Sequence, residues 1–83
     1  MTLILDIRDL PTDLPTDRRL ACVLARFNAL GPGDILRLVS DRDPQRMRVP
    51  LMADKRWRAT WFPEQQGPDT WMIRIEKLPR VDA

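Results

Sequence analysis

The spacing of apolar residues alternates between strand and helix repeats along the chain. Residues 3–8 form a short β-branched run that ends before Leu10 and Pro11, and this pattern predicts a first strand. Further on, apolar residues recur at i, i+3, i+4 and i+7, which is typical of a helix with one buried face. This stripe consists of Leu20, Val23, Leu24, Phe27 and Leu30.

Polar and special residues predict where this helix begins and ends. Asp13 or Thr16 is expected to cap the start, with Asp17 placed favourably in the first turn. After the stripe, Gly31 is expected to supply a left-handed C-terminal cap, and Pro32 blocks continuation. The helix therefore extends to about residue 30.

The middle of the chain predicts a second strand and a second helix. Residues 34–40 are mostly apolar and predict the strand. Asp43 then caps a new turn or helix with Pro44 in first position. Because Pro50 lacks an amide N–H, this helix is either kinked or begins near Pro50 and covers residues 51–55.

The last third of the chain predicts a hairpin that holds all three tryptophans. Residues 57–62 and 70–78 form two strands on either side of a turn at Gly67 and Pro68. The resulting order is βαβαββ. A βαβ unit has parallel strands and a right-handed crossover, so we expect one α+β two-layer sandwich with both helices on one face of the sheet. Residues 1–78 form this single domain, and residues 79–83 form a tail.

The period-two rule assigns each strand residue to one of two sheet faces. The helix side is predicted to hold Leu3, Leu5, Ile7, Leu36, Leu38, Trp57, Trp61, Trp71, Ile73 and Ile75. The open face is predicted to show Asp6, Arg8, Ile35, Arg37, Val39, Arg58, Thr60, Phe62, Met72, Arg74 and Glu76.

Arginines interleave with apolar residues on that open face, a composition typical of interface centres. The predicted binding residues are Arg8, Arg37, Arg58, Phe62, Met72 and Arg74. The partner is another copy of the chain, another protein or a nucleic acid, and the alternative is an ordinary solvated face. Nucleic acid is the weaker case, because stacking platforms need outward aromatic residues and most aromatics here face inward.

The composition argues against most enzyme chemistry. The chain has no histidine, which removes the commonest general base and metal ligand. With one cysteine, no soft-ligand metal site can form within the chain. Asp41 and Asp43 are better explained by a turn and cap than by a cation. Cys22 lies opposite the apolar stripe in a strip with Ala21, Ala25 and Ala29, which favours close approach of another helix over redox chemistry. We therefore expect a non-catalytic protein without cofactor or metal.

Charge and segment composition suggest a cytoplasmic setting. The net charge of +2 is a weak field, so it favours a coding bias over an anion-binding surface. No signal peptide is apparent, and no run approaches the roughly 20 apolar residues of a membrane helix. The single cysteine agrees with a reducing compartment.

Four segments resemble an uncharacterised bacterial domain-of-unknown-function family of the TusA/SirA-like group. They read L-D-I-R-D-L-P at 5–11, F-N-A-L-G-P-G at 27–33, V-S-D-R-D-P at 39–44 and Q-G-P-D-T-W-M-I-R-I at 66–75. The resemblance implies a sheet of order one-two-four-three. It also implies an accessory role beside hemerythrin-like proteins and nitrogen-oxide respiration. The motif positions are Asp6, Arg42, Asp43, Pro44, Trp61, Gly67, Pro68 and Trp71.

The chain departs from this group at two positions. TusA proteins carry a sulfur-transferring Cys-Pro pair after the first strand, where this chain has Thr12 and Asp13. The uncharacterised family often has histidine where Arg42 stands. The leading hypothesis is therefore an accessory binding module that acts through its open sheet face. A TusA-type sulfur carrier is the alternative, and an RNA-binding module is the third reading.

Overall fold

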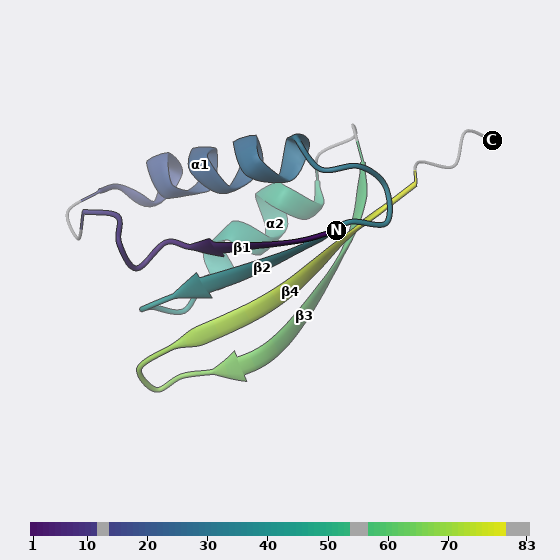
Figure 1. Ribbon diagram of the computed structural model, residues 1–83. Helices are drawn as coiled ribbons and strands as arrows, with labels where there is room; N and C mark the ends of the chain where they lie inside the picture. Colours follow the sequence, from purple (N-terminus) through teal and green to yellow (C-terminus); the bar gives the residue numbers. More distant parts are fainter. Residues whose placement is uncertain (12–13, 54–56, 80–83) are drawn as a thin grey trace.

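The computed structural model describes residues 1–11, 14–53 and 57–79 of the 83-residue chain (Figure 1). The elements follow the predicted order βαβαββ. They are β1 (Thr2–Asp6), α1 (Thr16–Asn28), β2 (Ile35–Ser40), α2 (Gln45–Met52), β3 (Arg58–Gln66) and β4 (Trp71–Leu78). Thr12, Asp13, Lys55 and residues 80–83, on which parts of the cap, sulfur-site, helix and tail predictions fall, lie outside the described residues.

The four strands form one mixed sheet of order β1-β2-β4-β3. β1 and β2 are parallel, whereas β4 runs antiparallel to both β2 and β3. Both helices pack on the same side of the sheet and leave its other face open (Figure 1). The predicted two-layer architecture, strand order and parallel βαβ unit are all confirmed. Within the described ranges, no helix is long and apolar enough to cross a membrane.

The core lies between the sheet and the two helices, as the period-two assignment predicts. Its buried residues include Ile7, Leu36, Leu38, Ile73 and Ile75 from the sheet side. The helices add Val23, Phe27, Leu30, Met47 and Leu51.

The tryptophans and Val39 refine the predicted faces. Trp57 is buried, with its ring edge-on to Phe27 at 5.0 Å between centroids. Trp61 and Trp71 are only half-buried. Val39 is predicted to show on the open face, but it is only 7% exposed, at a position paired with Asp6 on one side and Met72 on the other.

The N-terminus of α1 is held by an arginine instead of a side-chain cap. Thr16 is the first helical residue, and neither it nor Pro15 makes a side-chain cap bond, so the prediction of Thr16 as cap was wrong. Arg19 is 1% exposed, and its guanidinium donates to the backbone oxygens of Ile7, Pro11 and Leu14. These bonds tie the first turn of the helix to the connection that leads into it.

The C-terminus of α1 is held by a lysine from β4. Gly31 has no positive φ, so the predicted left-handed cap at this position is wrong; the positive φ in this loop belongs to Gly33. Lys77 is 8% exposed, and its ammonium donates to the carbonyl oxygens of Phe27, Asn28 and Leu30. A cation at a helix C-terminus also interacts favourably with the helix dipole.

Helix α2 begins before Pro50 and ends two residues after it. Of the two alternatives that the sequence leaves open, the helix starting near Pro50 is wrong, and the proline lies inside a helix that begins directly after Pro44. Asp43 accepts the backbone N–H of Gln45 at 3.0 Å, which supports its predicted capping role. The strip of Ala21, Cys22, Ala25 and Ala29 on α1 is exposed, so α2 does not pack on it as expected.

The β3–β4 hairpin turns at the predicted glycine. Gly67 has a φ of +79° and donates its N–H to the carbonyl of Thr70 at 2.9 Å. A Cβ atom at this position would lie 2.8 Å from the ring of Trp71. β3 also carries Pro63, and its pairing with β4 shifts register between Pro63 and Gln65. This strand forms one outer edge of the sheet, where proline is tolerated.

Replacing the buried ammonium tests the cap at the end of α1. Lys77→Met keeps the apolar stem but removes the donor to three carbonyls, so we expect a loss of about 2 kcal/mol in unfolding free energy. Urea unfolding measures this loss. Arg58→Met, at an exposed position on β3, is the control and should stay within about 0.5 kcal/mol of the wild type. A Lys77→Met protein as stable as the wild type would contradict the capping role.

Two glycines with positive φ separate backbone strain from ring contact. Gly67→Ala introduces a side chain at a positive φ and also brings its Cβ against the ring of Trp71. Gly33→Ala introduces a side chain at a φ of +89°, but no atom lies within 4 Å of the new Cβ. We expect Gly33→Ala to cost about 1 kcal/mol. Gly67→Ala is expected to cost at least about 1 kcal/mol more, because Trp71 must shift. Thermal unfolding of the two variants measures the difference, and equal losses would show that the ring contact costs nothing.

Candidate functional site

One row of residues crosses all four strands on the open face. Ile4 on β1 is paired with Arg37 on β2, Arg37 with Arg74 on β4, and Arg74 with Phe62 on β3. The two ends of the row are exposed apolar side chains, since Ile4 is 65% exposed and Phe62 is 54% exposed. We call these four residues the open-face row. It places two arginines side by side between two apolar groups.

The two arginines of the open-face row differ in their partners. Arg37 forms an ion pair with Glu64 at 3.0 Å. Arg74 lies over the ring of Phe62, with its guanidinium carbon 4.9 Å from the ring centroid. Such a cation–π contact holds the guanidinium while leaving its N–H groups turned to the surroundings. Arg74 forms no ion pair with any residue that the structure describes.

The other predicted binding residues lie at increasing distances from this row. Met72 is on β4, two residues from Arg74, and is half-buried. Arg58 is paired with Leu78, four residues from Phe62 along β3, so it lies roughly 13 Å from the row. Arg8 follows the end of β1. The structure thus brings Arg37, Phe62 and Arg74 together, with Met72 beside them, but it separates Arg8 and Arg58 from that cluster.

Arg8 is engaged with a carboxylate on the same edge of the sheet. Its Nη2 atom lies 2.7 Å from an oxygen of Asp6, and its backbone N–H donates to the other oxygen at 2.9 Å. The side-chain bond, followed by the backbone bond, lowers the pKa of Asp6 from its usual value. The pair is partly exposed, so solvent screens it.

A comparison with known protein families finds one family model that matches this chain. The family model described as "Uncharacterized conserved protein (DUF2249)" matches residues 4–77. The chain belongs to the DUF2249 family. Neither the curated proteins nor the solved structures contain a match to it. The match spans every strand and both helices of this DUF2249 member.

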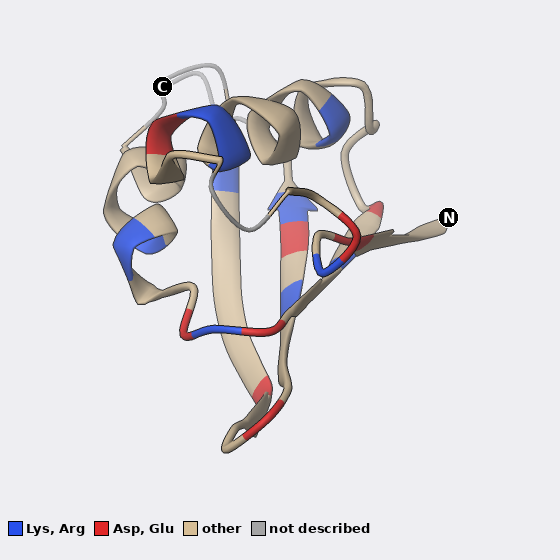
Figure 2. Ribbon diagram, turned by 90° about the vertical axis from the view of Figure 1, so that its left-hand side faces the viewer, with Lys and Arg blue, Asp and Glu red and all other residues tan. Residues whose placement is uncertain are grey.

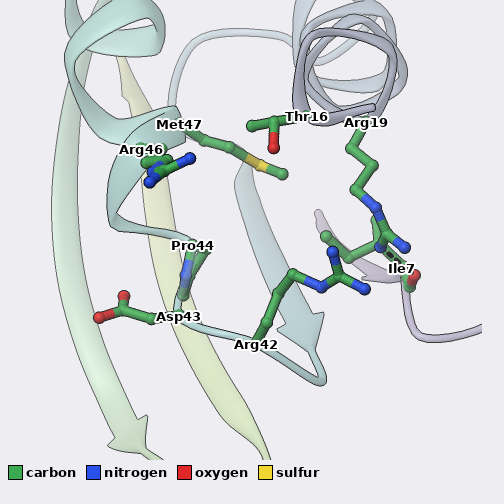
Figure 3. Close-up of a pocket in the computed structure, with 8 residues that line it drawn as sticks. All are labelled: Ile7, Thr16, Arg19, Arg42, Asp43, Pro44, Arg46 and Met47. Carbon is green, nitrogen blue, oxygen red and sulfur yellow. Dashed lines mark hydrogen bonds between the residues drawn. The ribbon is translucent and has the colours of Figure 1, made fainter. Parts of the chain in front are cut away.

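The motif residues of this DUF2249 member fall into two groups in space. Arg42, Asp43 and Pro44 lie between β2 and α2 and line a pocket of about 240 Å³ (Figure 3). Trp61 and Trp71, on β3 and β4, line a smaller pocket of about 80 Å³ that Asp43 also reaches. Gly67 and Pro68 form the hairpin turn next to Trp71, and Asp6 is paired with Arg8.

Two arginines that line the larger pocket were not among the predicted site residues. Arg19 and Arg46 join Arg42 around it, together with Thr16. A signal for Arg19 existed, because it lies four residues before Val23 and eight before Phe27, on the buried stripe of α1. A pattern that counts every arginine as a surface residue overlooks this position.

Among the residues that the structure describes, no group of three acidic, histidine or cysteine side chains is arranged to hold a metal ion. Cys22 is exposed in the middle of α1 and is a free thiol. It lies away from both pockets, whose lining residues do not include it.

The Asp6–Arg8 pair predicts a pH dependence of stability. A carboxylate with a lowered folded pKa stabilises the fold above its unfolded pKa of about 3.9, and this contribution is lost as the pH falls through the folded pKa. Asp6→Asn is therefore expected to be less stable than the wild type at pH 6, with the difference disappearing near pH 2. Denaturant unfolding at pH 6, 4 and 2 measures it.

Arg8→Gln is the matching control, because it changes the cationic partner of Asp6. It removes the cation, so its stability should fall at pH 6 and approach that of the wild type at pH 2 in the same way. A difference that persists unchanged at pH 2 in both variants would show that the charge of Asp6 contributes nothing to stability.

Proposed function

We propose that this chain is a non-catalytic docking module that binds an acidic segment of another protein through its open sheet face. The observation that carries this proposal is the open-face row, in which two arginines stand between two exposed apolar residues. Apolar anchors beside arginines are the residue types on which protein interfaces depend most. Both helices lie on the opposite face, so this face presents its strand residues without a covering layer (Figure 1).

The charge arrangement indicates what the partner carries. Arg37 and Arg74 are directly opposite each other, and like charges in that position destabilise a sheet. Glu64 compensates Arg37, whereas Arg74 lies over the ring of Phe62 and has no ion pair among the described residues. A carboxylate from a partner would supply the missing counter-charge to Arg74. An apolar residue next to that carboxylate would cover Phe62, which is 54% exposed.

The family setting supports an accessory role. We propose that the DUF2249 family is a bacterial branch of the TusA/SirA-like group, because the strand order and the one-sided helices agree with what the resemblance implies. The free, exposed thiol of Cys22 supports a reducing, cytoplasmic location. The link to nitrogen-oxide respiration comes from the resemblance alone and stays a prediction.

The alternatives have less structural support. A sulfur carrier needs a thiolate at a favourable position, and Cys22 lies in the middle of α1, away from the field of the helix N-terminus. An RNA-binding module needs outward aromatics for stacking. Phe62 is the aromatic residue on the open face that a base could stack on, because Trp57 is buried and Trp61 packs against the core.

A paired arginine variant tests the docking face. Arg37→Ser/Arg74→Ser removes both guanidinium groups from exposed or half-exposed positions, so stability should change by less than about 1 kcal/mol. Wild-type and variant proteins are immobilised and exposed to lysate from the source organism, and the retained proteins are identified by mass spectrometry. We expect at least one acidic protein to be retained by the wild type and lost with the double variant.

Arg18→Ser/Arg26→Ser is the matched control, because both arginines are exposed on α1, on the other side of the molecule. It should retain the same acidic protein as the wild type. The identified protein is then purified, and its affinity for each chain is measured by calorimetry, where the open-face variant should bind at least about 30-fold more weakly. Equal retention by all three chains would overturn the proposal, as would loss of folding in the open-face variant.

A further inference from the structure

We propose that the pocket at the ends of β1 and β2 binds a small tetrahedral oxyanion of the phosphate or sulfate class. This site is separate from the docking face, because none of its lining residues belongs to the open-face row. It occupies about 240 Å³ and lies where the two parallel strands finish and both helices begin (Figure 3). In open α/β sheets, ligands bind outside the carboxyl ends of the strands.

Three arginines from three parts of the chain line the pocket. Arg19 comes from α1, Arg42 from the connection after β2, and Arg46 from the first turn of α2. Figure 3 shows the guanidinium of Arg42 directed towards that of Arg19, with the hydroxyl of Thr16 turned into the space between the elements. Guanidinium groups match the oxygen spacing of phosphate and carboxylate groups, so this arrangement favours an anion.

Arg19 is the residue on which the argument depends most. Its guanidinium is buried, yet its partners are the neutral backbone oxygens of Ile7, Pro11 and Leu14, at 3.3, 2.9 and 3.3 Å. It forms no ion pair with a described residue. A guanidinium has five N–H donors, so three carbonyls leave two of them for another acceptor. Burying a charge is costly, and none of the described residues supplies a counterion to Arg19, so an anion in the adjoining pocket would lower that cost.

The start of α1 adds a second source of positive potential. Thr16 opens this 13-residue helix, whose cap residue Pro15 makes no side-chain bond to the first turn, and Asp17 is the acidic residue of that turn among those described. Unbonded N–H groups and the helix dipole make such a terminus favourable for an anion. Figure 2 shows blue segments on α1, on the β2–α2 connection and on α2 around this end of the molecule, with red segments beside those of α1 and of the connection.

Two described acidic residues lie near the pocket. Asp43 is the one described acidic residue in its lining, and its carboxylate accepts the backbone N–H of Gln45 and points away from Arg19 and Arg42 (Figure 3). Asp41 lies 3.6 Å from Nε of Arg42 on the same connection. Among the residues that the structure describes, the lining has three arginines and one aspartate. The volume lies below the roughly 300–1,000 Å³ of pockets for drug-sized ligands, which favours a small anion.

Amide NMR with simple anions tests the site. Uniformly ¹⁵N-labelled protein is titrated with sodium phosphate, sodium sulfate and methyl phosphate, each against sodium chloride of equal ionic strength. We expect saturable shifts at Ile7, Thr16, Arg42 and Arg46 with the oxyanions and none with chloride. Tighter binding of methyl phosphate than of inorganic phosphate would identify a phosphomonoester as the natural source, and the reverse order would identify a free inorganic anion.

Two arginines on one helix provide a matched pair of variants. Arg46→Gln removes a lining group, whereas Arg48→Gln changes an exposed residue of the same helix that does not line the pocket. We expect Arg46→Gln to weaken oxyanion affinity about tenfold and Arg48→Gln to leave it unchanged. Both positions are exposed, so neither variant removes the bonds of Arg19 that hold the fold.

Three outcomes would overturn the proposal. They are shifts that do not saturate, equal weakening by Arg46→Gln and Arg48→Gln, and saturable shifts confined to the open-face row. The Arg37→Ser/Arg74→Ser protein should bind the oxyanion as well as the wild type does. Oxyanion binding should therefore be lost in Arg46→Gln alone, and protein capture should be lost in the open-face variant alone. The two measurements report on different sites.

Discussion

The position of α1 over the sheet depends on one buried ammonium group. Lys77 extends from β4 on the same face as Ile73 and Ile75, between the rings of Phe27 and Trp57, with its Nζ atom 5.6 and 5.0 Å from their centroids. Its three N–H groups meet three carbonyl oxygens at the end of α1. Its own backbone pairs with Gly33 and Asp34, in the loop that follows the helix. One residue thus joins the sheet, the helix end and the loop.

Arg19 likewise binds backbone carbonyls at the other end of α1, but its ratio of N–H donors to carbonyl acceptors is different. The ammonium of Lys77 has as many donors as the carbonyls that surround it, so its hydrogen-bonding capacity is used within the protein. The guanidinium of Arg19 has more donors than carbonyl partners. The same helix therefore has one end that is chemically complete and one end that can accept a further group. The end with the spare donors among the described contacts is the one that adjoins the pocket.

Much of the fold follows from local patterns in the sequence. The apolar stripe of α1, the alternation of β4 and the turn at Gly67 each specify one element, and together they leave little freedom in the topology. The buried cations escaped this reasoning, because patterns of polarity treat lysine and arginine as surface residues. Lys77 nevertheless follows Ile73 and Ile75 at the period of a strand. Its presence on the core face is also the reason why Gly31 is not needed as a left-handed cap.

Local patterns in the sequence also predict part of the candidate site. Alternation correctly separated Arg37, Phe62 and Arg74 from the core, since it depends only on the period of two. Their neighbours across the sheet depend on register, which the sequence does not state, and register is what separates Arg58 from the cluster. The larger pocket is built from residues 7–47, and its walls meet only after the βαβ crossover has formed. No local window of the sequence contains it.

The two outer strands of the sheet are unequal, and this limits how copies of the chain can assemble. β3 carries a proline without an N–H and a shift in register, so it offers no regular ladder to an incoming strand. β1 is short but regular. An open filament built by strand addition needs two edges that accept each other, whereas a symmetric pair needs only one. Joining through strand edges therefore stops at two copies, and Pro63 protects the chain from growth into fibres.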